Sequence, residues 1–373
     1  MTTTPPLRSR AADAAGYSLV EMLIAVLVLT TVMGAAMTAL TDAVRANEAV
    51  VHATALNNTL RSGMDLIVRD LLQTGSGLPT GHVIQIPSGG TATAMRRPGP
   101  PGTAYTSAAG DLTVAAVIPG PGRGPTINGV ATDTITILTA DNNFTDVKLS
   151  AVSPTTVDVV ASVNIAAGVD RVSPGQLMMV RKQSMTTLVQ VTSIDAATRR
   201  ITFGSPDSLN LNQSAVGISG NLRAITLTAP TSPAAAAADA TTITRVRMVS
   251  YYLDNTTSPG HPRLVRRINN GDHQTFNNTL GTAVALDVEN LQFSYDLNNG
   301  GNNPGNVRFV GNDLIADGTC GDNPCSPTQI RKVNVLLAAR SSNSGVPRTK
   351  VYRNMLTSQV SLRGMAFVNE YQQ

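Results

Sequence analysis

Residues 16–40 read GYSLVEMLIAVLVLTTVMGAAMTAL, and this stretch decides the first element of the fold. From Leu19 to Leu40 it is an apolar run, interrupted by Glu21 and scattered threonines. A helix of about 20 apolar residues spans a bilayer, so the run predicts a membrane-spanning helix. Arg8 and Arg10 precede it, and basic residues tend to stay in the cytoplasm. We therefore expect the chain beyond Leu40 on the far side of the membrane.

Two ordinary interpretations of this segment compete with a functional anchor. A secretory signal peptide would place its cut near Ala36 or Ala39, but the run exceeds the usual length of about 7–15 residues and holds a carboxylate. A plain signal anchor would leave that carboxylate, Glu21, unexplained. A charge in lipid is costly and usually marks a function.

The segment Gly16-Tyr17-Ser18-Leu19-Val20-Glu21-Met22-Leu23-Ile24 resembles the prepilin cleavage and methylation motif of type IV pilins and type II secretion pseudopilins. The resemblance implies that a membrane-embedded prepilin peptidase cuts after Gly16 and methylates the new amino terminus at Tyr17. Phenylalanine is commoner at this place in the family, and here another aromatic residue fills it. The resemblance also implies that Glu21 pairs with the Tyr17 amine of an adjacent subunit. Such a pair would neutralise a carboxylate that is costly to bury alone.

The composition indicates an extracellular, β-rich protein. Apolar residues make up 42% of the chain and charged residues only 14%, and threonine, asparagine, glycine and alanine are plentiful. The net charge is +4, and no block of lysine and arginine with interleaved aromatic residues occurs. We therefore expect no nucleic-acid partner.

Residues 41–74 continue the helical period on one apolar face. That face carries Ala49, Ala53, Leu56, Leu60, Met64, Ile67 and Leu71. The glycines and proline of residues 74–79 end the pattern. We predict one helix from Tyr17 to about Gln73, with residues 17–40 in lipid and residues 41–74 packed under a head. A coiled coil is the alternative, but heptads flanked by charges are lacking.

Residues 75–240 are expected to form a loop- and β-rich insertion. Residues 80–130 are rich in glycine and proline and predict loops; a phosphate-binding loop is disfavoured because no Lys-Ser/Thr follows the glycines. The predicted strands are 134–139, 176–181, 188–194 and 199–203, with a hairpin turn at 195–198. A Pro-containing break at 230–233 and an alanine run at 234–238 close the insertion.

Residues 241–373 are expected to form an antiparallel sheet that covers the apolar face of the helix, which gives an α+β fold. The predicted strands are 244–253, 263–268, 286–295, 330–338 and 354–362. Segments 249–254, 262–267, 288–295 and 358–363 are similar, in that order, to large minor pilins of the PilW type, which are related to J-type pseudopilins of type II secretion. The resemblance implies a pilin fold: a long helix packed on an antiparallel head.

Two smaller features predict local chemistry in the head. Cys320 and Cys325 would lie outside the cytoplasm, where thiols oxidise, so a structural disulfide is predicted. A redox pair is the alternative, but such motifs have two intervening residues, whereas four occur here. Asp296 and Asn298 offer oxygen ligands at alternate positions, as calcium loops do, yet the bidentate glutamate of such loops is missing. An asparagine-rich hairpin loop is the plainer interpretation.

These patterns predict a minor pilin and not an enzyme, because no catalytic motif occurs. Residues 1–16 would be a leader, and the mature chain would be a single-pass inner-membrane protein with a periplasmic head that enters a surface filament. Its expected partners are prepilin peptidase, other pilins, the inner-membrane assembly platform and lipid, and no cofactor is expected. The alternatives are a type II secretion pseudopilin, or a tethered binding module whose insertion recognises a surface, a polysaccharide or DNA.

Overall fold

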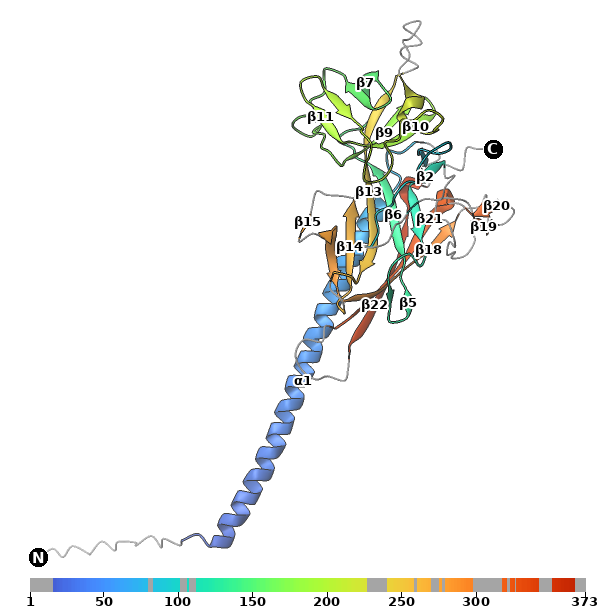
Figure 1. The fold of residues 1–373 in the computed structure, drawn as a ribbon. Helices are drawn as coiled ribbons and strands as arrows, with labels where there is room; N and C mark the ends of the chain where they lie inside the picture. The colour runs from blue at the N-terminus through green and yellow to red at the C-terminus, as the bar shows by residue number, and fades with distance from the viewer. Residues whose placement is uncertain are drawn as a thin grey trace, which may run out of the picture. The chain divides into compact units, whose positions relative to one another are not determined.

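The computed structural model describes residues 16–79, 83–100, 106, 112–226, 240–257, 260–269, 275–276, 279–297, 317–320, 323–325, 327–341 and 351–365. The chain forms two compact units, residues 1–54 and residues 55–373. One long α-helix contributes to both units, and antiparallel sheets form most of the regular structure of the second (Figure 1). The expected α+β class is confirmed.

Helix α1 (Leu19–Leu72) has 54 residues and, at about 1.5 Å per residue, is about 81 Å long. No proline interrupts it. Beyond its end, Gly75 and Gly77 have φ angles of +77° and +69°, a left-handed backbone that glycine adopts without strain. The predicted helix, Tyr17 to about Gln73, agrees with these bounds to within two residues.

The second half of α1 buries one apolar stripe in the core of the second unit. The stripe consists of Leu56, Leu60, Met64, Ile67 and Leu71. Between these side chains the sheets approach closely at Gly63, where an added Cβ would lie 3.1 Å from Leu264 and 3.3 Å from Leu337. The predicted stripe is confirmed from Leu56 onward, whereas Ala53 is exposed.

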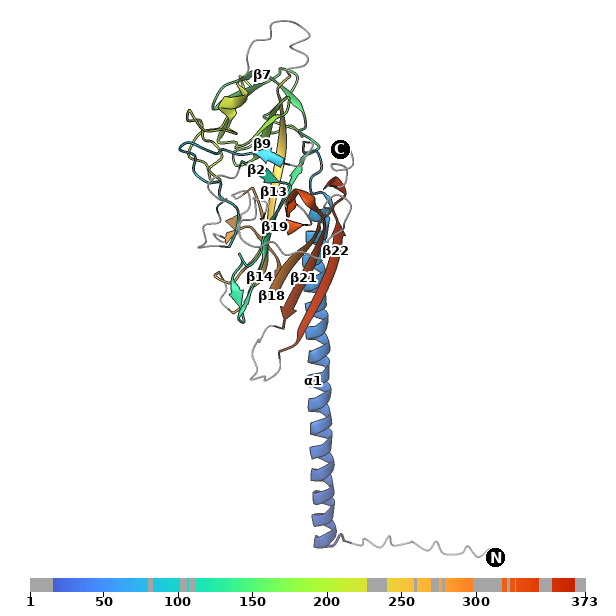
Figure 2. The same ribbon diagram turned by 90° about the vertical axis from the view of Figure 1, so that its right-hand side faces the viewer.

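A three-stranded antiparallel sheet covers part of this stripe. It consists of β18 (Val288–Leu297), β21 (Ile330–Arg340) and β22 (Arg353–Ser361), in the order β18-β21-β22 (Figure 2). Buried residues alternate with more exposed ones along β18 and β21, so each of these strands turns one face to the core. The core face contributes Phe293, Val335 and Leu337 to the cluster that contains the α1 stripe.

A second sheet is built around the long strand β13 (Thr242–Asp254). Its other strands are β3 (Val117–Gly120), β6 (Thr134–Ala140), β7 (Val147–Val152), β8 (Thr156–Val159), β9 (Leu177–Lys182), β10 (Met185–Gln190), β11 (Ser193–Asp195), β12 (Arg200–Thr202), β14 (Arg263–Ile268) and β17 (Thr282–Leu286). β13 pairs with β6, β7, β9 and β14. The expected boundary at residue 240 therefore does not separate two sheets, because β13 completes a sheet begun before it.

Part of this sheet curves into a small open barrel around its own core. Thr242 at the start of β13 pairs with Lys148 of β7 on one side and with Arg181 of β9 on the other. The path then runs from β7 through β8 and β12 to β11, and from β9 to β10, and β10 and β11 are consecutive in the chain. The barrel has its own apolar core, which includes Phe144, Val157 and Phe203. Among the described strands, β10 and β11 stand at the two ends of this path and do not pair with each other.

The expectation that residues 80–130 form only loops is wrong. They contain β1 (Val83–Gln85), β2 (Thr113–Ala115), β3, β4 (Thr126–Ile127) and β5 (Val130–Ala131). The apolar run around Val117 is buried and pairs through β3 with β6. Pro119 is tolerated because β3 pairs on one side only and an edge strand can lack an N–H.

Two predicted strands are each divided in the structure. The strand expected at 188–194 is split between β10 and β11, and the strand expected at 286–295 spans the end of β17 and most of β18. Asp287 separates these two with a φ of +56°, which interrupts an extended backbone. The other predicted strands and the 195–198 turn are confirmed. The break at 230–233 and the alanine run at 234–238 lie outside the described residues.

Short elements complete the description. They are β15 (Thr275–Phe276), β16 (Thr279–Leu280), β19 (Asp317–Cys320), β20 (Asn323–Cys325) and the 3-10 helices η1 (Leu222–Ile225), η2 (Pro327–Gln329) and η3 (Arg363–Met365).

Candidate functional site

The predicted cleavage junction lies directly before α1 and is accessible. Gly16 and Tyr17 are both exposed, and Tyr17 has 86% of its surface open to solvent. A Cβ added at Gly16 would meet no atom within 4 Å. Nothing in the described part of the chain therefore requires glycine at this position. The leader residues 1–15 lie outside the described residues.

Glu21 and Ser18 cap the start of α1 reciprocally. The Ser18 backbone N–H donates to Glu21 Oε2 over 3.0 Å, and the Glu21 backbone N–H donates to Ser18 Oγ over 3.3 Å. This is a capping box, in which two N–H groups that lack helical partners are satisfied by side chains. The carboxylate also lies at the positive end of the helix dipole. Sequence reasoning missed the role of Ser18, although the Ser-x-x-Glu spacing before an apolar run signals it.

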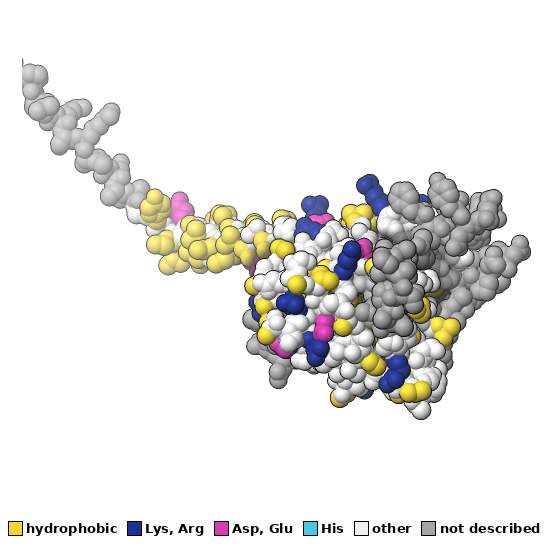
Figure 3. Space-filling view, turned by 90° about the horizontal axis from the view of Figure 1, so that it is seen from above, with side chains coloured by type: hydrophobic (Ala, Val, Ile, Leu, Met, Phe, Trp, Pro, Cys, Tyr) yellow, Lys and Arg dark blue, Asp and Glu magenta, His cyan; other side chains and the backbone are white. Residues whose placement is uncertain are grey.

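The apolar surface of the first half of α1 is open. Between Leu19 and Leu40 its large apolar side chains are Leu19, Val20, Met22, Leu23, Ile24, Val26, Leu27, Val28, Leu29, Val32, Met33, Met37 and Leu40, and all are exposed. Figure 3 shows hydrophobic side chains covering the visible surface of this segment. The helix is long and apolar enough to cross a membrane, which is consistent with a single-pass anchor.

Threonine hydroxyls within this apolar segment are satisfied by the helix itself. Thr31 Oγ1 donates to the carbonyl of Val28 over 2.8 Å, and Thr38 Oγ1 donates to the carbonyl of Gly34 over 2.9 Å. Thr30 and Thr41 make equivalent bonds to carbonyls three and four residues earlier. Hydroxyls bonded in this way do not need water. Glu21 is then the single ionisable side chain from Leu19 to Thr41.

A buried charge cluster joins the second half of α1 to the large sheet. Asp70 on α1 accepts two bonds from Arg266 of β14, to Oδ2 over 2.6 Å and to Oδ1 over 3.1 Å. The Tyr251 hydroxyl of β13 donates to Asp70 Oδ2 over 2.5 Å. Burial, and then the nearby carboxylate, raise the pKa of Tyr251 far above its ordinary value. The position of Asp70, three residues after Ile67 on the apolar stripe, was the signal that sequence reasoning passed over.

Comparison of the chain with protein-family models, with curated proteins and with solved structures finds no match. The family resemblance at Gly16–Ile24 therefore rests on the residues themselves.

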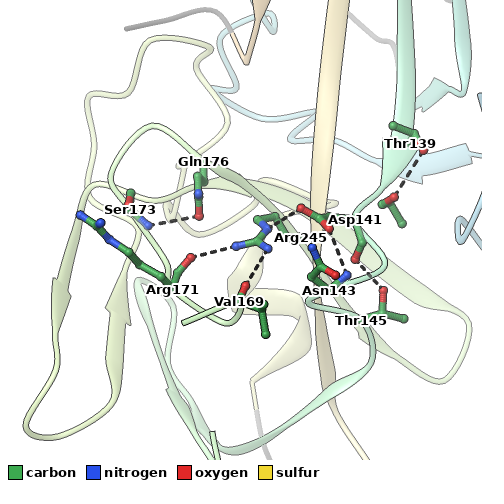
Figure 4. Close-up of polar contacts among 10 residues, drawn as sticks. Thr139, Asp141, Asn143, Thr145, Val169, Arg171, Ser173, Gln176 and Arg245 are labelled. Carbon is green, nitrogen blue, oxygen red and sulfur yellow. Dashed lines mark hydrogen bonds and ion pairs between the residues drawn. The ribbon is translucent and has the colours of Figure 1, made fainter. Parts of the chain in front are cut away.

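A second buried cluster surrounds Arg245 of β13. Figure 4 shows the Arg245 guanidinium between the Asp141 carboxylate and the backbone of Val169 and Arg171. Arg245 Nε lies 3.0 Å from Asp141 Oδ2, and its two terminal nitrogens donate to the carbonyls of Arg171 and Val169 over 2.8 Å and 3.2 Å. The guanidinium also stacks over the Phe144 ring, 5.6 Å from its centroid. Every nitrogen of the side chain has a partner, so the cluster fixes a loop and leaves no anion site.

The calcium candidate Asp296 already has partners on the three-stranded sheet. Its Oδ1 accepts from Asn334 Nδ2 over 3.1 Å, its Oδ2 accepts from Gln359 Nε2 over 3.2 Å, and Lys332 Nζ lies 3.8 Å from Oδ2. An ammonium group at the carboxylate competes with a cation. Asn298 lies outside the described residues, and within the described ranges no three histidine, cysteine, aspartate or glutamate side chains gather as a metal site.

The predicted disulfide falls on two strands of which only the backbone is described. Cys320 ends β19 and Cys325 ends β20, and these two strands pair antiparallel. The structure thus places the two residues in one hairpin, and the bond between their sulfur atoms stays a prediction.

Proposed function

We propose that the chain is a minor pilin of a type IV pilus, cleaved after Gly16 by prepilin peptidase and built into the filament at or near its tip. The observation that carries the proposal is the junction itself. An exposed Gly16–Tyr17 bond directly precedes a helix whose first half is apolar, solvent-exposed and charged at Glu21 alone.

The space around Gly16 means that its own chain does not require glycine there, so any requirement for glycine would come from another protein. An added methyl group would meet open space there, so a requirement for glycine would come from a peptidase that binds the backbone closely. Cleavage after Gly16 leaves Ser18 and Glu21 in the mature chain, so the capping box survives processing. The new amine of Tyr17 would appear one residue before the cap.

The capping box also supports a role for Glu21 during assembly. Before assembly, the Ser18 N–H and the positive end of the helix partly offset the cost of a carboxylate in lipid. In the filament, the Tyr17 amine of a neighbouring subunit would add a full positive charge. A buried carboxylate gains more from a charged partner than from a neutral donor. Neutralisation of Glu21 would therefore favour subunit docking.

The packing of the second half of α1 against the head also supports a role as a pilin subunit. Its apolar stripe and Asp70 contact sheets of the same chain, so the head is packed against the C-terminal half of its own helix. Such an arrangement fits the pilin-type head that the sequence resemblance implies.

The test replaces two glycines that both face open space. Gly16→Val should leave the precursor uncleaved and absent from sheared surface filaments, whereas Gly34→Val should be cleaved normally. A third variant, Glu21→Gln, should be cleaved but fail to enter filaments. Normal cleavage of Gly16→Val would contradict the proposal.

A type II secretion pseudopilin is supported by the same residues and differs in the machine served. Deleting the gene separates the two: a pilus role predicts loss of surface pili and twitching with protein secretion intact.

A tethered binding module is favoured by one separate observation, the barrel-like part of the large sheet with its own apolar core. A module that only packs into a filament does not need such an addition. Normal piliation after deletion of the gene, together with loss of binding to a surface, a polysaccharide or DNA, would favour this function.

A further inference from the structure

Five asparagine residues of the sequence stand two positions before a serine or a threonine, with a residue other than proline between. They are Asn57, Asn143, Asn212, Asn255 and Asn277. The pattern Asn-x-Ser/Thr is the acceptor for N-linked glycans when it lies in a surface loop of an exported protein. Because a short pattern also occurs by chance, the structure has to decide which of the five can carry a glycan.

Three of these asparagines are engaged or enclosed by the fold. Asn57 lies within α1, and its side chain accepts a hydrogen bond from a side chain of β22. Asn212 is buried, and its Nδ2 donates to two backbone carbonyls over 2.7 Å and 2.9 Å. Asn255 Oδ1 is enclosed and has no hydrogen-bond partner in the described part of the chain. Asn277 lies outside the described residues.

Asn143 differs from these three. It is exposed in the turn between β6 and β7, and Figure 4 shows it beside Asp141 and Thr145. Its backbone N–H donates to Asp141 Oδ1 over 3.0 Å, whereas its side-chain amide makes no hydrogen bond to a described residue. A glycan on Asn143 Nδ2 would therefore displace no hydrogen bond of the folded chain.

An acidic residue also distinguishes the segment around Asn143. Asp141 stands two positions before this asparagine, and none of the other four has an acidic residue at that place. A charge beside the acceptor gives an enzyme a feature by which to select it. In the folded chain Arg245 Nε lies 3.0 Å from Asp141 Oδ2, so the carboxylate is open to an enzyme only before this contact forms.

The order of the chain leaves time for such recognition. Arg245 follows Asp141 by 104 residues, which take about 5–20 s to synthesise at roughly 5–20 residues per second. Until β13 has emerged, the turn lacks Arg245, and the Phe144 ring lacks the guanidinium that stacks over it. During this interval the segment Asn143-Phe144-Thr145 is not yet fixed by these contacts and can enter an enzyme as an extended acceptor.

We propose that Asn143 carries an N-linked glycan, transferred from a lipid diphosphate carrier on the outer side of the membrane. Asn143 Nδ2 forms a bond to C1 of the first sugar, and the bond from C1 to the diphosphate oxygen breaks. The electron pair of that bond leaves with the diphosphate, and one amide proton passes to a base of the transferase. The inference rests on the topology of the proposed function, which places the head outside the cytoplasm, and needs neither cleavage nor filament assembly.

The test is peptide mass spectrometry of the whole chain, isolated from the membranes of the cells that produce it. In most copies the peptide that contains Asn143 should be heavier by the mass of an oligosaccharide, and fragmentation should place the added mass on this residue. Unmodified Asn143 would overturn the inference, whichever residue the chain begins with. The amino-terminal peptide of the same sample, beginning at Tyr17 or not, decides the proposed function separately.

Substitutions within the turn sharpen the result. Thr145→Val removes the hydroxyl of the acceptor pattern and should abolish the added mass, whereas Thr145→Ser keeps the hydroxyl and should keep the mass. Thr145→Val also loses an exposed bond to the Asp141 carbonyl, so Asn143→Gln, which leaves that bond in place, is the second variant that should lose the mass. Asn142→Gln changes an exposed neighbour outside the pattern and should stay glycosylated. Retention of the added mass in Thr145→Val or Asn143→Gln would overturn the proposal.

Discussion

The two halves of α1 are equally continuous as helix but differ in where their apolar surface finds a partner. From Leu19 to Leu40 every large apolar side chain is exposed, whereas Leu56, Leu60, Met64, Ile67 and Leu71 are buried by sheets of the same chain. Exposed apolar surface of this extent requires a membrane or another protein. The first half of the helix therefore needs a partner outside the chain, whereas the second half is packed within the chain.

The largest expected effect comes from the buried ion pair of the second half. Arg266→Met would leave the Asp70 carboxylate buried with the Tyr251 hydroxyl as its remaining side-chain donor, and should lower the free energy of unfolding of the head by about 3–5 kcal/mol. Urea unfolding followed by circular dichroism measures it. The matched control is Arg45→Met, which removes an exposed pair with Asp42 on α1 outside the packed stripe and should leave the free energy of unfolding unchanged. An equal loss in the free energy of unfolding of both variants would contradict this difference between the packed and the exposed parts of the helix.

A smaller but similar contrast is expected for leucine. Leu60, with 1% of its surface exposed, should lose about 2–5 kcal/mol of head stability on replacement by alanine. Leu40, with 61% exposed, should lose none in the same replacement. Both variants are compared by urea midpoint in the same detergent. A shift for Leu40→Ala as large as that for Leu60→Ala would mean that the first half is also packed within the chain.

Alkaline pH should weaken the attachment of the second half alone. The pKa of Tyr251 is raised in the folded state. The stability that its protonated hydroxyl contributes is therefore fully present below the unfolded pKa near 10 and is lost as the pH rises toward the folded pKa. Tyr251→Phe should lower stability by about 1.5–3 kcal/mol at neutral pH and reduce the loss of stability above pH about 10. An identical alkaline limb for Tyr251→Phe and the unmodified chain would contradict this account. Burial also raises the pKa of Tyr252 to about 12, so part of the alkaline loss should persist in Tyr251→Phe.

The smallest expected effect is at the start of the helix. Ser18→Ala removes one half of the capping box and should destabilise the first turn by about 1 kcal/mol, while Ser18→Thr retains the hydroxyl. Hydrogen exchange at the Glu21 amide reports this locally. Unchanged exchange at Glu21 in Ser18→Ala would show that the bond between the hydroxyl and this amide does not contribute.

Much of the fold could be predicted because its patterns are local. The 3.6-residue period of Leu56–Leu71 predicts a helix, and the β-branched runs of β6 and β14 predict strands. Neither prediction needs information about residues distant in sequence. The strands within residues 80–130 were missed because glycine and proline dominate their neighbourhood. The barrel was missed because it depends on pairing Thr242 with both Lys148 and Arg181, far apart in sequence.

The candidate site divides in the same way. Gly16, Tyr17 and Glu21 were predicted from a contiguous motif, and the structure adds Ser18 through a contact with Glu21 within one helical turn. Asp70, Tyr251 and Arg266 come together from three separate elements, so no linear pattern relates them.

The most direct test of the central claim is the amino-terminal sequence and mass of the protein isolated from membranes. We expect a chain that begins at Tyr17, carries a methyl group on its α-amine and retains the whole apolar half of α1. A chain that begins at Met1, or just after Ala36 or Ala39 as a secretory signal peptide would leave it, would contradict the account.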